Sequence, residues 1–262
     1  MRIQDFAKRK SAGVPITMVT CYDAWSAALI AETDIDCVLV GDSVAMVVHG
    51  HDTTIPADLE MMTTHTAAVR RGAPDAFVIG DMPFLSYRRG LAASVDAAGA
   101  LMRSGANAVK LEGAAGNLEL IRHLVESGVP VMGHLGLTPQ SVHQLGGFRV
   151  QAKNDRAAER LIEQAVELEL AGWFAIVLEA IPAAVAERAT ARMTIPTIGI
   201  GAGRHVDGQV LVLQDLLGVS TSYRPKFVRT WMDGSKMITT ALQSYHRDVT
   251  EGRFPNGGES YE

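Results

Sequence analysis

Charged side chains follow several apolar stretches of this sequence that are typical of buried strands. The stretches span residues 38–43, 77–81, 108–112, 129–134 and 175–179. In a strand, side chains alternate between two sides, so Val38, Val40 and Asp42 would point the same way. A titratable group at the end of a buried strand is costly unless it has a partner or a function. Five such strand ends therefore indicate a functional site.

The carboxylates of Asp42, Asp81 and Glu112 are candidate metal ligands. Asp42 and Asp81 each follow a glycine and a buried strand, so they would meet at the ends of neighbouring strands. Oxygen donors without the Cys and His spacing of a zinc site fit a hard octahedral cation such as Mg²⁺. Alternatively, each aspartate simply caps the helix that follows it.

Lys110 lies two residues before Glu112 in one strand, so both side chains would face the same side. At the C-terminal end of the strand, the lysine could neutralise carboxylates or bind an anionic group of a substrate. The alternative is a structural buried ion pair, because a buried lysine needs such a partner. His134 ends the next strand and fits a hydrogen bond within the core as well as a supporting role at the site.

Glu179 ends the most apolar of these strands and is followed by Ala180, Ile181 and Pro182. This sequence predicts little charge around the carboxylate. Desolvation raises the pKa of a carboxyl group and makes it a better proton acceptor, so we expect Glu179 to be a general base. The alternative is a glutamate at the edge of the core that pairs with an arginine.

The composition is that of a folded protein with a small-molecule partner. Of the 262 residues, 47% are hydrophobic and 20% are charged, and the net charge of −5 supplies no basic field for nucleic acid or anionic lipid. Cys21 and Cys37 adjoin apolar runs and are expected to behave as small hydrophobic residues. The absence of a signal peptide and of 18 consecutive apolar residues predicts a cytoplasmic protein.

Hydrophobic periodicity predicts an alternation of helices and strands along the chain. The predicted strands span 17–21, 38–43, 76–81, 108–112, 129–134, 174–179, 197–201 and a part of 209–213. The predicted helices span 3–10, 24–32, 56–71, 91–104, 118–127, 156–171, 182–192 and 229–249. The charges of Lys8, Arg9 and Lys10 are expected to form a solvated face of the first helix.

The connections differ in length and composition. Residues 43–56 are predicted to be extended, and the tail 252–262 to be poorly ordered. The polar connection 136–155 exceeds the usual length of a loop between strand and helix, which is typical of a lid or of disorder.

This alternation predicts an α/β protein with a parallel sheet, in one domain over residues 1–262. An open doubly wound sheet would gather only two or three polar strand ends at its switch point. A closed (β/α)8 TIM barrel brings the ends of all its strands together on one face. We therefore expect the barrel, with its site at the C-terminal ends of the strands.

Two further motifs carry less information. The glycines of 199–203 follow a strand, but their spacing differs from the dinucleotide-binding fingerprint, so a tight turn or a close approach to a ligand explains them equally well. His49 and His51 would face one way in an extended segment, but without a third ligand they are more typical of hydrogen bonds within a loop.

Six segments together closely resemble one enzyme family, the ketopantoate hydroxymethyltransferases, also called 3-methyl-2-oxobutanoate hydroxymethyltransferases. The similarity covers nearly the whole chain, and the order and spacing of the segments make it specific. The segments are Val40 to Ser43, His49 to Asp52, His65 to Ala73, Lys110 to Gly113, Gly133 to Ser141 and Ile198 to Gly203.

The resemblance implies a TIM barrel of the phosphoenolpyruvate/pyruvate-binding type that acts in pantothenate and coenzyme A biosynthesis. The implied reaction is Mg²⁺-dependent transfer of a hydroxymethyl group from 5,10-methylenetetrahydrofolate to 3-methyl-2-oxobutanoate, through an enolate. The implied assembly is a homodecamer, a pentamer of dimers. By position, Asp42 and Asp81 are implied metal ligands with Glu112 at the metal site, Glu179 is the proton acceptor, and Asp42, Ser43, Asp81 and Lys110 contact the keto acid.

The sequence departs from the family pattern in two places. Ala45 stands where the family usually has glycine, and Ser222 to Pro225 replace a region that is often rich in His, Ile and Pro. Arg224 and Lys226 are candidates for binding the anionic tail of the folate, or belong to a solvated face.

Three alternative functions stay open at this point. The first is a diverged paralogue that acts on another 2-keto acid. The second is a Mg²⁺-dependent, enolate-forming lyase of the isocitrate lyase and phosphonopyruvate type, although the reactive cysteine loop of the lyase branch is not visible here. The third is a protein that binds a metal and a keto acid without catalysis.

Overall fold

The computed structural model describes residues 1–220 and 225–261. The chain divides into two compact units, Met1–Val212 and Leu213–Glu262. We describe each unit by itself.

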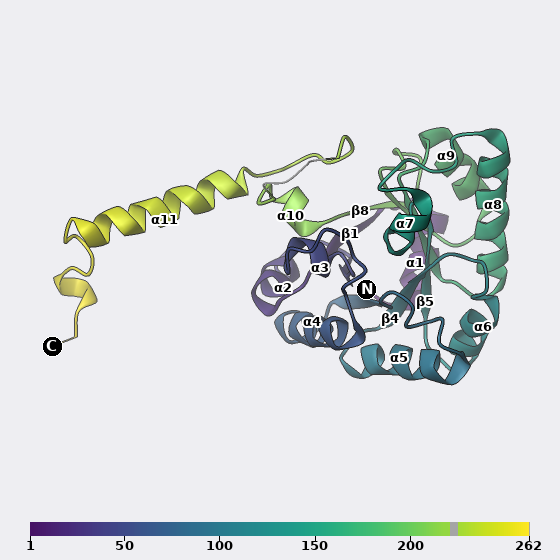
Figure 1. Ribbon diagram of the computed structural model, residues 1–262, viewed down its shortest axis with the longest axis horizontal. Coiled ribbons are helices and arrows are strands. Elements are labelled where there is room, and N and C mark those ends of the chain that lie inside the picture. The colour runs from purple at the N-terminus through teal and green to yellow at the C-terminus, as the bar shows by residue number, and fades with distance from the viewer. Residues whose placement is uncertain (221–224, 262) are drawn as a thin grey trace. The chain divides into compact units, whose positions relative to one another are not determined.

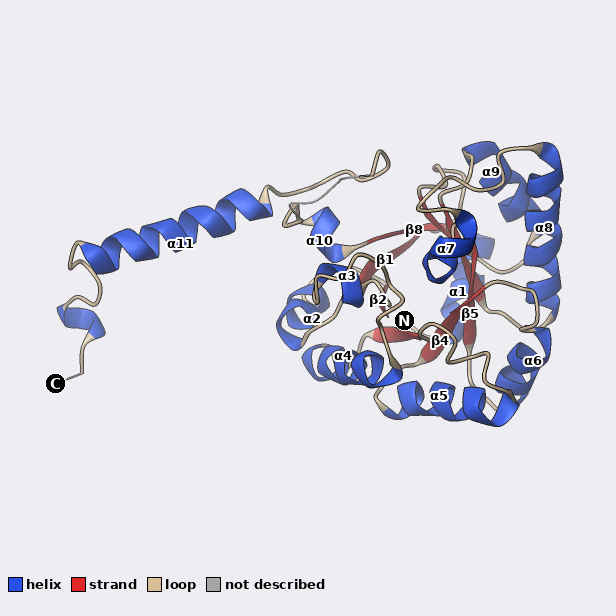
Figure 2. Ribbon diagram, viewed as in Figure 1, coloured by secondary structure: helices blue, strands red, loops and turns tan. Residues whose placement is uncertain are grey.

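The first unit is a closed barrel of eight parallel strands in sequential order, as the sequence predicts. Figures 1 and 2 show these strands inside a ring of helices. The strands are β1 (Ile16–Thr20), β2 (Cys37–Val40), β3 (Phe77–Asp81), β4 (Ala108–Glu112), β5 (Val131–Gly136), β6 (Ala175–Glu179), β7 (Thr197–Ile200) and β8 (Gly208–Leu211). Because all of them are parallel, their C-terminal ends share one face of the barrel.

The helices of the first unit follow the predicted order. They are α1 (Ile3–Ala12), α2 (Ala24–Ala31), α3 (Val44–Val47), α4 (Leu59–Gly72), α5 (Leu91–Arg103), α6 (Leu118–Glu126), the 3₁₀ helix η1 (Pro139–Ser141), α7 (Val142–Leu145), α8 (Asp155–Leu170) and α9 (Ala183–Arg192). Helix α8 shows the principle of their packing: its apolar residues, among them Leu161 and Leu168, are buried, while Asn154 accepts a hydrogen bond from the backbone N–H of Ala157 at its start. Burial of each leucine side chain contributes about 2 kcal/mol to the stability of the folded state.

Alternate strand residues fill the interior of the barrel. The buried core there includes Cys37 and Leu39 of β2, Phe77 and Ile79 of β3, and Ala108 of β4. By the same alternation, Asp81, Lys110 and Glu112 continue this inward side at the C-terminal ends of their strands. Asp42 differs, because β2 ends at Val40 and the inward residues of β2 are not Val38 and Val40. Asp42 therefore reaches the site through the turn after β2, and the prediction that it shares a side with Val38 and Val40 along a strand is wrong.

Strand β5 approaches its covering layer unusually closely at Gly133. A Cβ atom at this position would lie 1.6 Å from Cζ3 of Trp173, a fully buried side chain. Only glycine leaves room for the indole against the strand. This close packing holds the strand residue beside Gly133, which is His134, in its place at the barrel mouth.

Helix α1 closes the N-terminal end of the barrel. The Phe6 ring is fully buried and packs against Phe77 and Phe174, with ring centroids 5.2 and 4.9 Å apart. Arg9 Nη2 lies 2.5 Å from Asp36 Oδ1, and Lys10 Nζ lies 2.7 Å from Asp207 Oδ2. The prediction of a purely solvated basic face is thus wrong for Arg9 and Lys10.

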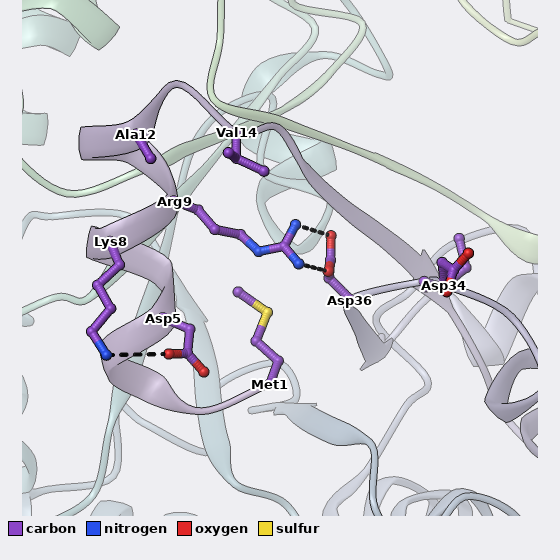
Figure 3. Close-up of a pocket in the computed structure, with 9 residues that line it drawn as sticks. Met1, Asp5, Lys8, Arg9, Ala12, Val14, Asp34 and Asp36 are labelled. Atoms are coloured by element: carbon purple, nitrogen blue, oxygen red, sulfur yellow. Dashed lines mark hydrogen bonds and ion pairs between the residues drawn. The ribbon is translucent and has the colours of Figure 1, made fainter.

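A hollow of about 530 Å³ adjoins this end of the barrel, at the face opposite the C-terminal strand ends. Figure 3 shows two ion pairs among its lining side chains, Lys8 with Asp5 and Arg9 with Asp36. These charges neutralise one another within the structure.

Two predicted connections contain short helices. Residues 43–56 are not extended throughout, because α3 begins directly after Ser43, with a hydrogen bond from the Val47 N–H to the Ser43 carbonyl. Helix α4 begins at Leu59 and not at Pro56, since the Asp58 side chain accepts a hydrogen bond from the Met61 N–H. The connection 136–155 holds η1 and α7.

The second unit contains α10 (Leu213–Leu216), α11 (Gly234–Thr250) and the 3₁₀ helix η2 (Gly257–Glu259). Helix α11 begins at Gly234, five residues after the predicted start. It exposes several large apolar side chains, including Met237, Ile238, Leu242 and Tyr245. The described tail residues 252–261 are exposed. In the described part of the chain, no helix has both the length and the apolar character to cross a membrane.

Candidate functional site

Two aspartates meet at the C-terminal mouth of the barrel. Asp81 is the last residue of β3, and Asp42 lies in the turn after β2. The backbone N–H of Asp42 donates a hydrogen bond to Asp81 Oδ2 over 3.4 Å, and both side chains are buried. Burial raises the pKa of both carboxyl groups, and for Asp42 the neighbouring charges of Asp81 and Glu112 raise it further.

Lys110 supplies a positive charge to this acidic group. Its Nζ atom lies 2.7 Å from Asp81 Oδ2, and Asp81 and Lys110 are register partners in neighbouring strands. Burial lowers the pKa of Lys110, but the charges of Asp81, Glu112 and Asp42 outweigh it and raise the pKa above its usual value. The ammonium group is therefore held in its charged form.

His134 lies between two glutamates. Its Nδ1 atom is 3.3 Å from Glu112 Oε1, and its Nε2 atom is 3.2 Å from Glu179 Oε2. Burial and the charge of Lys110 lower the pKa of His134, but the nearby carboxylates of Glu112 and Glu179 raise it more, to about 9. The prediction that little charge surrounds Glu179 is wrong, because the ring of His134, a titratable group with a raised pKa, lies against its carboxylate. The glutamate side chain is still partly open, with 17% of its surface exposed.

The residues at this mouth suit a hard divalent cation. Asp42, Asp81 and Glu112 are three buried oxygen-donor side chains, and Asp81 Oδ1 is buried without a hydrogen-bond partner among the described residues. A cation there would satisfy this oxygen and offset the crowded negative charge. In residues 1–220 and 225–261, no three His, Cys, Asp or Glu side chains form a preassembled metal cluster. Mg²⁺ needs only one or two carboxylates and completes its octahedron with water and substrate oxygens.

Gln140 of η1 is a central residue that the analysis of single strands missed. Its Nε2 atom donates hydrogen bonds to Asp42 Oδ2 and to the Met82 carbonyl, each over 2.9 Å, and its backbone N–H donates to Glu112 Oε2 over 3.1 Å. The Tyr87 hydroxyl donates to Gln140 Oε1 over 2.7 Å. The side-chain amide of Gln140 thus ties the turn after β2 to the loop after β3, and its backbone N–H ties both to β4.

Ser43 lies beside Asp42 at the start of α3. Its hydroxyl group is 2.8 Å from the Tyr22 hydroxyl, a contact that sequence analysis did not suggest. The structure therefore brings together all seven predicted site residues at one end of the barrel. They are Asp42, Ser43, Asp81, Lys110, Glu112, His134 and Glu179.

Other predicted features lie apart from this group. His49, in the loop after α3, forms a hydrogen bond with His65 of α4, whose Nδ1 lies 2.5 Å from the Tyr22 carbonyl. Cys21 and Cys37 are both free and buried, as predicted. Arg224 and the departure at 222–224 lie outside the described residues, and Lys226 is an exposed residue of the second unit.

Comparison with known sequences gives a consistent result. The family model of ketopantoate hydroxymethyltransferase matches residues 1–257. A 3-methyl-2-oxobutanoate hydroxymethyltransferase of Bdellovibrio bacteriovorus is 56% identical over 259 residues, which cover 99% of this chain and 98% of the relative. An enzyme of the same name from Coxiella burnetii is 51% identical and covers 98% of this chain and 97% of the relative.

Comparison with solved structures bears on the fold alone. A phosphonopyruvate hydrolase solved with oxalate and Mg²⁺ matches with a TM-score of 0.64 at 10% identity, over 99% of this chain and 93% of that chain. A 2,3-dimethylmalate lyase of the PEP mutase/isocitrate lyase superfamily matches with a TM-score of 0.61 at 13% identity, over 99% of this chain and 91% of that chain. These neighbours share the barrel architecture. With a family model matched over residues 1–257 and relatives identical at half of their positions, the chain belongs to the ketopantoate hydroxymethyltransferase family.

Proposed function

We propose that this chain transfers a hydroxymethyl group from 5,10-methylenetetrahydrofolate to 3-methyl-2-oxobutanoate. The product is 2-dehydropantoate, also called ketopantoate, in the first committed step of pantothenate and coenzyme A synthesis. Membership of the family supports this reaction. The observation that carries the mechanism is that a pair of acidic residues, Asp42 and Asp81, shares one barrel mouth with Glu179 and the histidine that contacts it.

Asp42 and Asp81 are the proposed ligands of Mg²⁺, and Glu112 contributes to the same site. When bound, the ion would polarise the carboxylate and keto oxygens of the substrate and stabilise the negative charge that develops on them. Ser43 and Lys110 would contact the keto acid at this position. The ammonium group of Lys110 is suited to this role because neighbouring carboxylates keep it charged.

Glu179 is the proposed general base that removes the proton from C3 of the keto acid. Nε2 of His134 lies 3.2 Å from Oε2 of Glu179, so the histidine ring fixes the position of the proposed base at the barrel mouth. His134 is held in turn by Glu112, so it positions the carboxylate of Glu179. The Glu179 side chain keeps 17% of its surface exposed, which supports access of a substrate to the carboxylate.

The remaining steps balance with water as the second reactant. The proton from C3 passes to Glu179, and C3 forms a bond to the methylene carbon of the folate while one of its C–N bonds breaks toward nitrogen. Water then adds its oxygen to that carbon as the second C–N bond breaks. Tetrahydrofolate leaves with the electron pairs of both C–N bonds and takes up two protons, the one held by Glu179 and one from the water. This regenerates the base, and the hydroxymethyl group remains on the keto acid.

The direct test is formation of ketopantoate from the two substrates with Mg²⁺. A panel of 2-keto acids in the same assay distinguishes a diverged paralogue, and a lyase would instead cleave 2-hydroxy acids or phosphonopyruvate. Exchange of the C3 hydrogen in D₂O without folate separately tests enolate formation. Binding of Mg²⁺ and keto acid without exchange and without transfer would contradict the proposed function and leave a binding protein.

The proposed assembly is a homodecamer. The exposed apolar side chains of α11 support association with other copies, because large apolar patches on a surface are typical of interfaces. The proposed partners of the site are small molecules, a keto acid and a folate.

A further inference from the structure

A second hollow, of about 420 Å³, opens beside the proposed metal site. It reaches Glu112 and Gln140, which form one of its walls, but Asp42, Asp81, Lys110 and Glu179 do not line it. The rest of the wall comes from the loops after β3, β4 and β5 and from the first half of α8. We name this hollow the side pocket. It is large enough for a sizeable small molecule and shares a wall with the site of the proposed reaction.

The side pocket combines three kinds of side chain. Phe84 and Tyr87 supply aromatic surface, and Phe84 is 38% exposed. Gln144 and Gln164 supply amide groups, and Arg160 supplies a cation. Arg160 is exposed and makes no ion pair or hydrogen bond with any residue that the structure describes. Its charge is therefore available to a ligand.

Strained backbone marks the same region. Among the described residues other than glycine, three have a positive φ: Leu85 at 62°, Ala152 at 53° and Ala180 at 46°. Leu85 and Ala152 line the side pocket, and Ala180 follows Glu179 directly. Each such residue costs about 1 kcal/mol or more, and strain of this kind clusters at ligand sites.

We propose that the side pocket binds the folate co-substrate, an inference that rests on the proposed function. A folate has a flat pteridine with a hydrogen-bonding edge, an apolar benzoyl ring and an anionic glutamate tail. The amides of Gln144 and Gln164 match the pteridine edge, the aromatic wall matches the rings, and Arg160 matches a tail carboxylate. The wall at Glu112 and Gln140 places the methylene carbon next to the keto acid.

Helix α8 offers a matched pair of arginines for a test. Ala157, Arg160, Leu161 and Gln164 recur at intervals of three and four and line the pocket on one side of the helix. Arg156 is exposed on the same helix but does not line the pocket. Arg160→Ala and Arg156→Ala therefore remove the same charge from two positions, only one of which faces the proposed ligand.

The first measurement is the Kd of tetrahydrofolate for the full-length protein by calorimetry. We expect Arg160→Ala to raise this Kd about 10-fold, as for the loss of a hydrogen bond to a charged group, and Arg156→Ala to leave it unchanged. Exchange of the C3 hydrogen of 3-methyl-2-oxobutanoate in D₂O, without folate, should be the same in both variants as in the unmodified protein. Equal effects of the two substitutions on the Kd would overturn the proposal.

A truncated ligand separates the two ends of the folate. With tetrahydropteroate, which lacks the glutamate tail, the effect of Arg160→Ala should disappear, whereas Gln164→Ala should weaken the binding of both ligands. If Arg160→Ala weakens tetrahydropteroate binding as strongly as tetrahydrofolate binding, the assignment of the tail is overturned.

The two proposals fail in different ways. Normal hydroxymethyl transfer and C3 exchange, combined with unchanged folate binding in Arg160→Ala and Gln164→Ala, would place the folate elsewhere and leave the proposed function intact. Absence of transfer in the unmodified protein, with keto acid and Mg²⁺ bound, would overturn both.

Discussion

At the scale of single residues, the barrel mouth is governed by an excess of buried negative charge. Asp42, Asp81 and Glu112 are all buried, and Lys110 offsets only part of their charge. Crowding of this kind is unfavourable in an empty site and becomes favourable when a divalent cation is bound. Burial, and then the neighbouring charges of Asp81 and Glu112, raise the pKa of Asp42 well above its usual value.

Asp81→Asn should weaken the Mg²⁺-dependent binding of the keto acid at least about 10-fold, because it removes a ligand charge while keeping the size of the side chain. Calorimetric titration of keto acid with and without Mg²⁺ measures the effect. Asp34→Asn is the matched control, since Asp34 is exposed at the opposite end of the barrel. An unchanged Mg²⁺ dependence in Asp81→Asn would place the metal elsewhere.

Glu179→Gln tests the base. An amide cannot accept the C3 proton, so exchange of this hydrogen in D₂O should fall about 100-fold or more, while the keto acid still binds. Proton NMR follows the exchange, and calorimetry follows the binding. Glu163→Gln on the exposed side of α8 should exchange normally. Exchange at the usual rate in Glu179→Gln would refute its assignment as the base.

At the scale of elements, α1 closes the N-terminal end of the barrel. Lys10 and Asp207 are largely buried, and the Asp207 carboxylate also accepts hydrogen bonds from the backbone N–H and the hydroxyl of Thr197. One carboxylate thus connects α1 to β7. Lys8, two residues earlier, pairs with Asp5 of its own helix, over 3.7 Å.

The two lysines of α1 should therefore differ in their contribution to stability. Lys10→Ala leaves a largely buried carboxylate without its cation and should cost about 2 kcal/mol of unfolding free energy. Lys8→Ala removes a side chain that is 76% exposed and should cost less than about 0.5 kcal/mol. Urea denaturation of the two variants measures the difference. If both variants lost a similar amount of unfolding free energy, the ion pair between Lys10 and Asp207 would add nothing to stability.

The order of strands and helices could be predicted from the sequence, because apolar residues recur with a different period in a strand than in a helix. Inward positions such as Asp81 and Glu112 were also predictable, since alternation in a strand sets the side on which a residue lies. Gln140 was not predictable in this way, because its contacts join residues 58 and 98 positions away. The pairing of Arg9 and Lys10 was missed for the same reason: Asp36 and Asp207 approach α1 only when the barrel closes.

At the scale of the whole barrel, closure depends on the seam between the first and the last strand. Strand β8 pairs with β1 from Ile16 opposite Gly208 to Val19 opposite Leu211. All eight strand ends can share one mouth only if this seam forms, so Asp42 and Glu179 depend on it although neither lies in β1 or β8. Gly208 has no room for a side chain at this seam, because a Cβ atom there would lie 2.4 Å from the Ile16 carbonyl oxygen.

Gly208→Ala should therefore destabilise the barrel as a whole. The added methyl group would clash with the backbone of β1, which no rotamer change can relieve. We therefore expect the free energy of unfolding to fall by about 3 kcal/mol. Hydrogen exchange should show weaker protection in β1 and β8 first, and C3 exchange of the keto acid should fall as the mouth opens. Gln209→Val alters the next residue of the strand, whose side chain is exposed, and should change both readouts little. If Gly208→Ala kept full protection along β1, ring closure would tolerate a side chain at this seam, and the link between the seam and the site would be refuted.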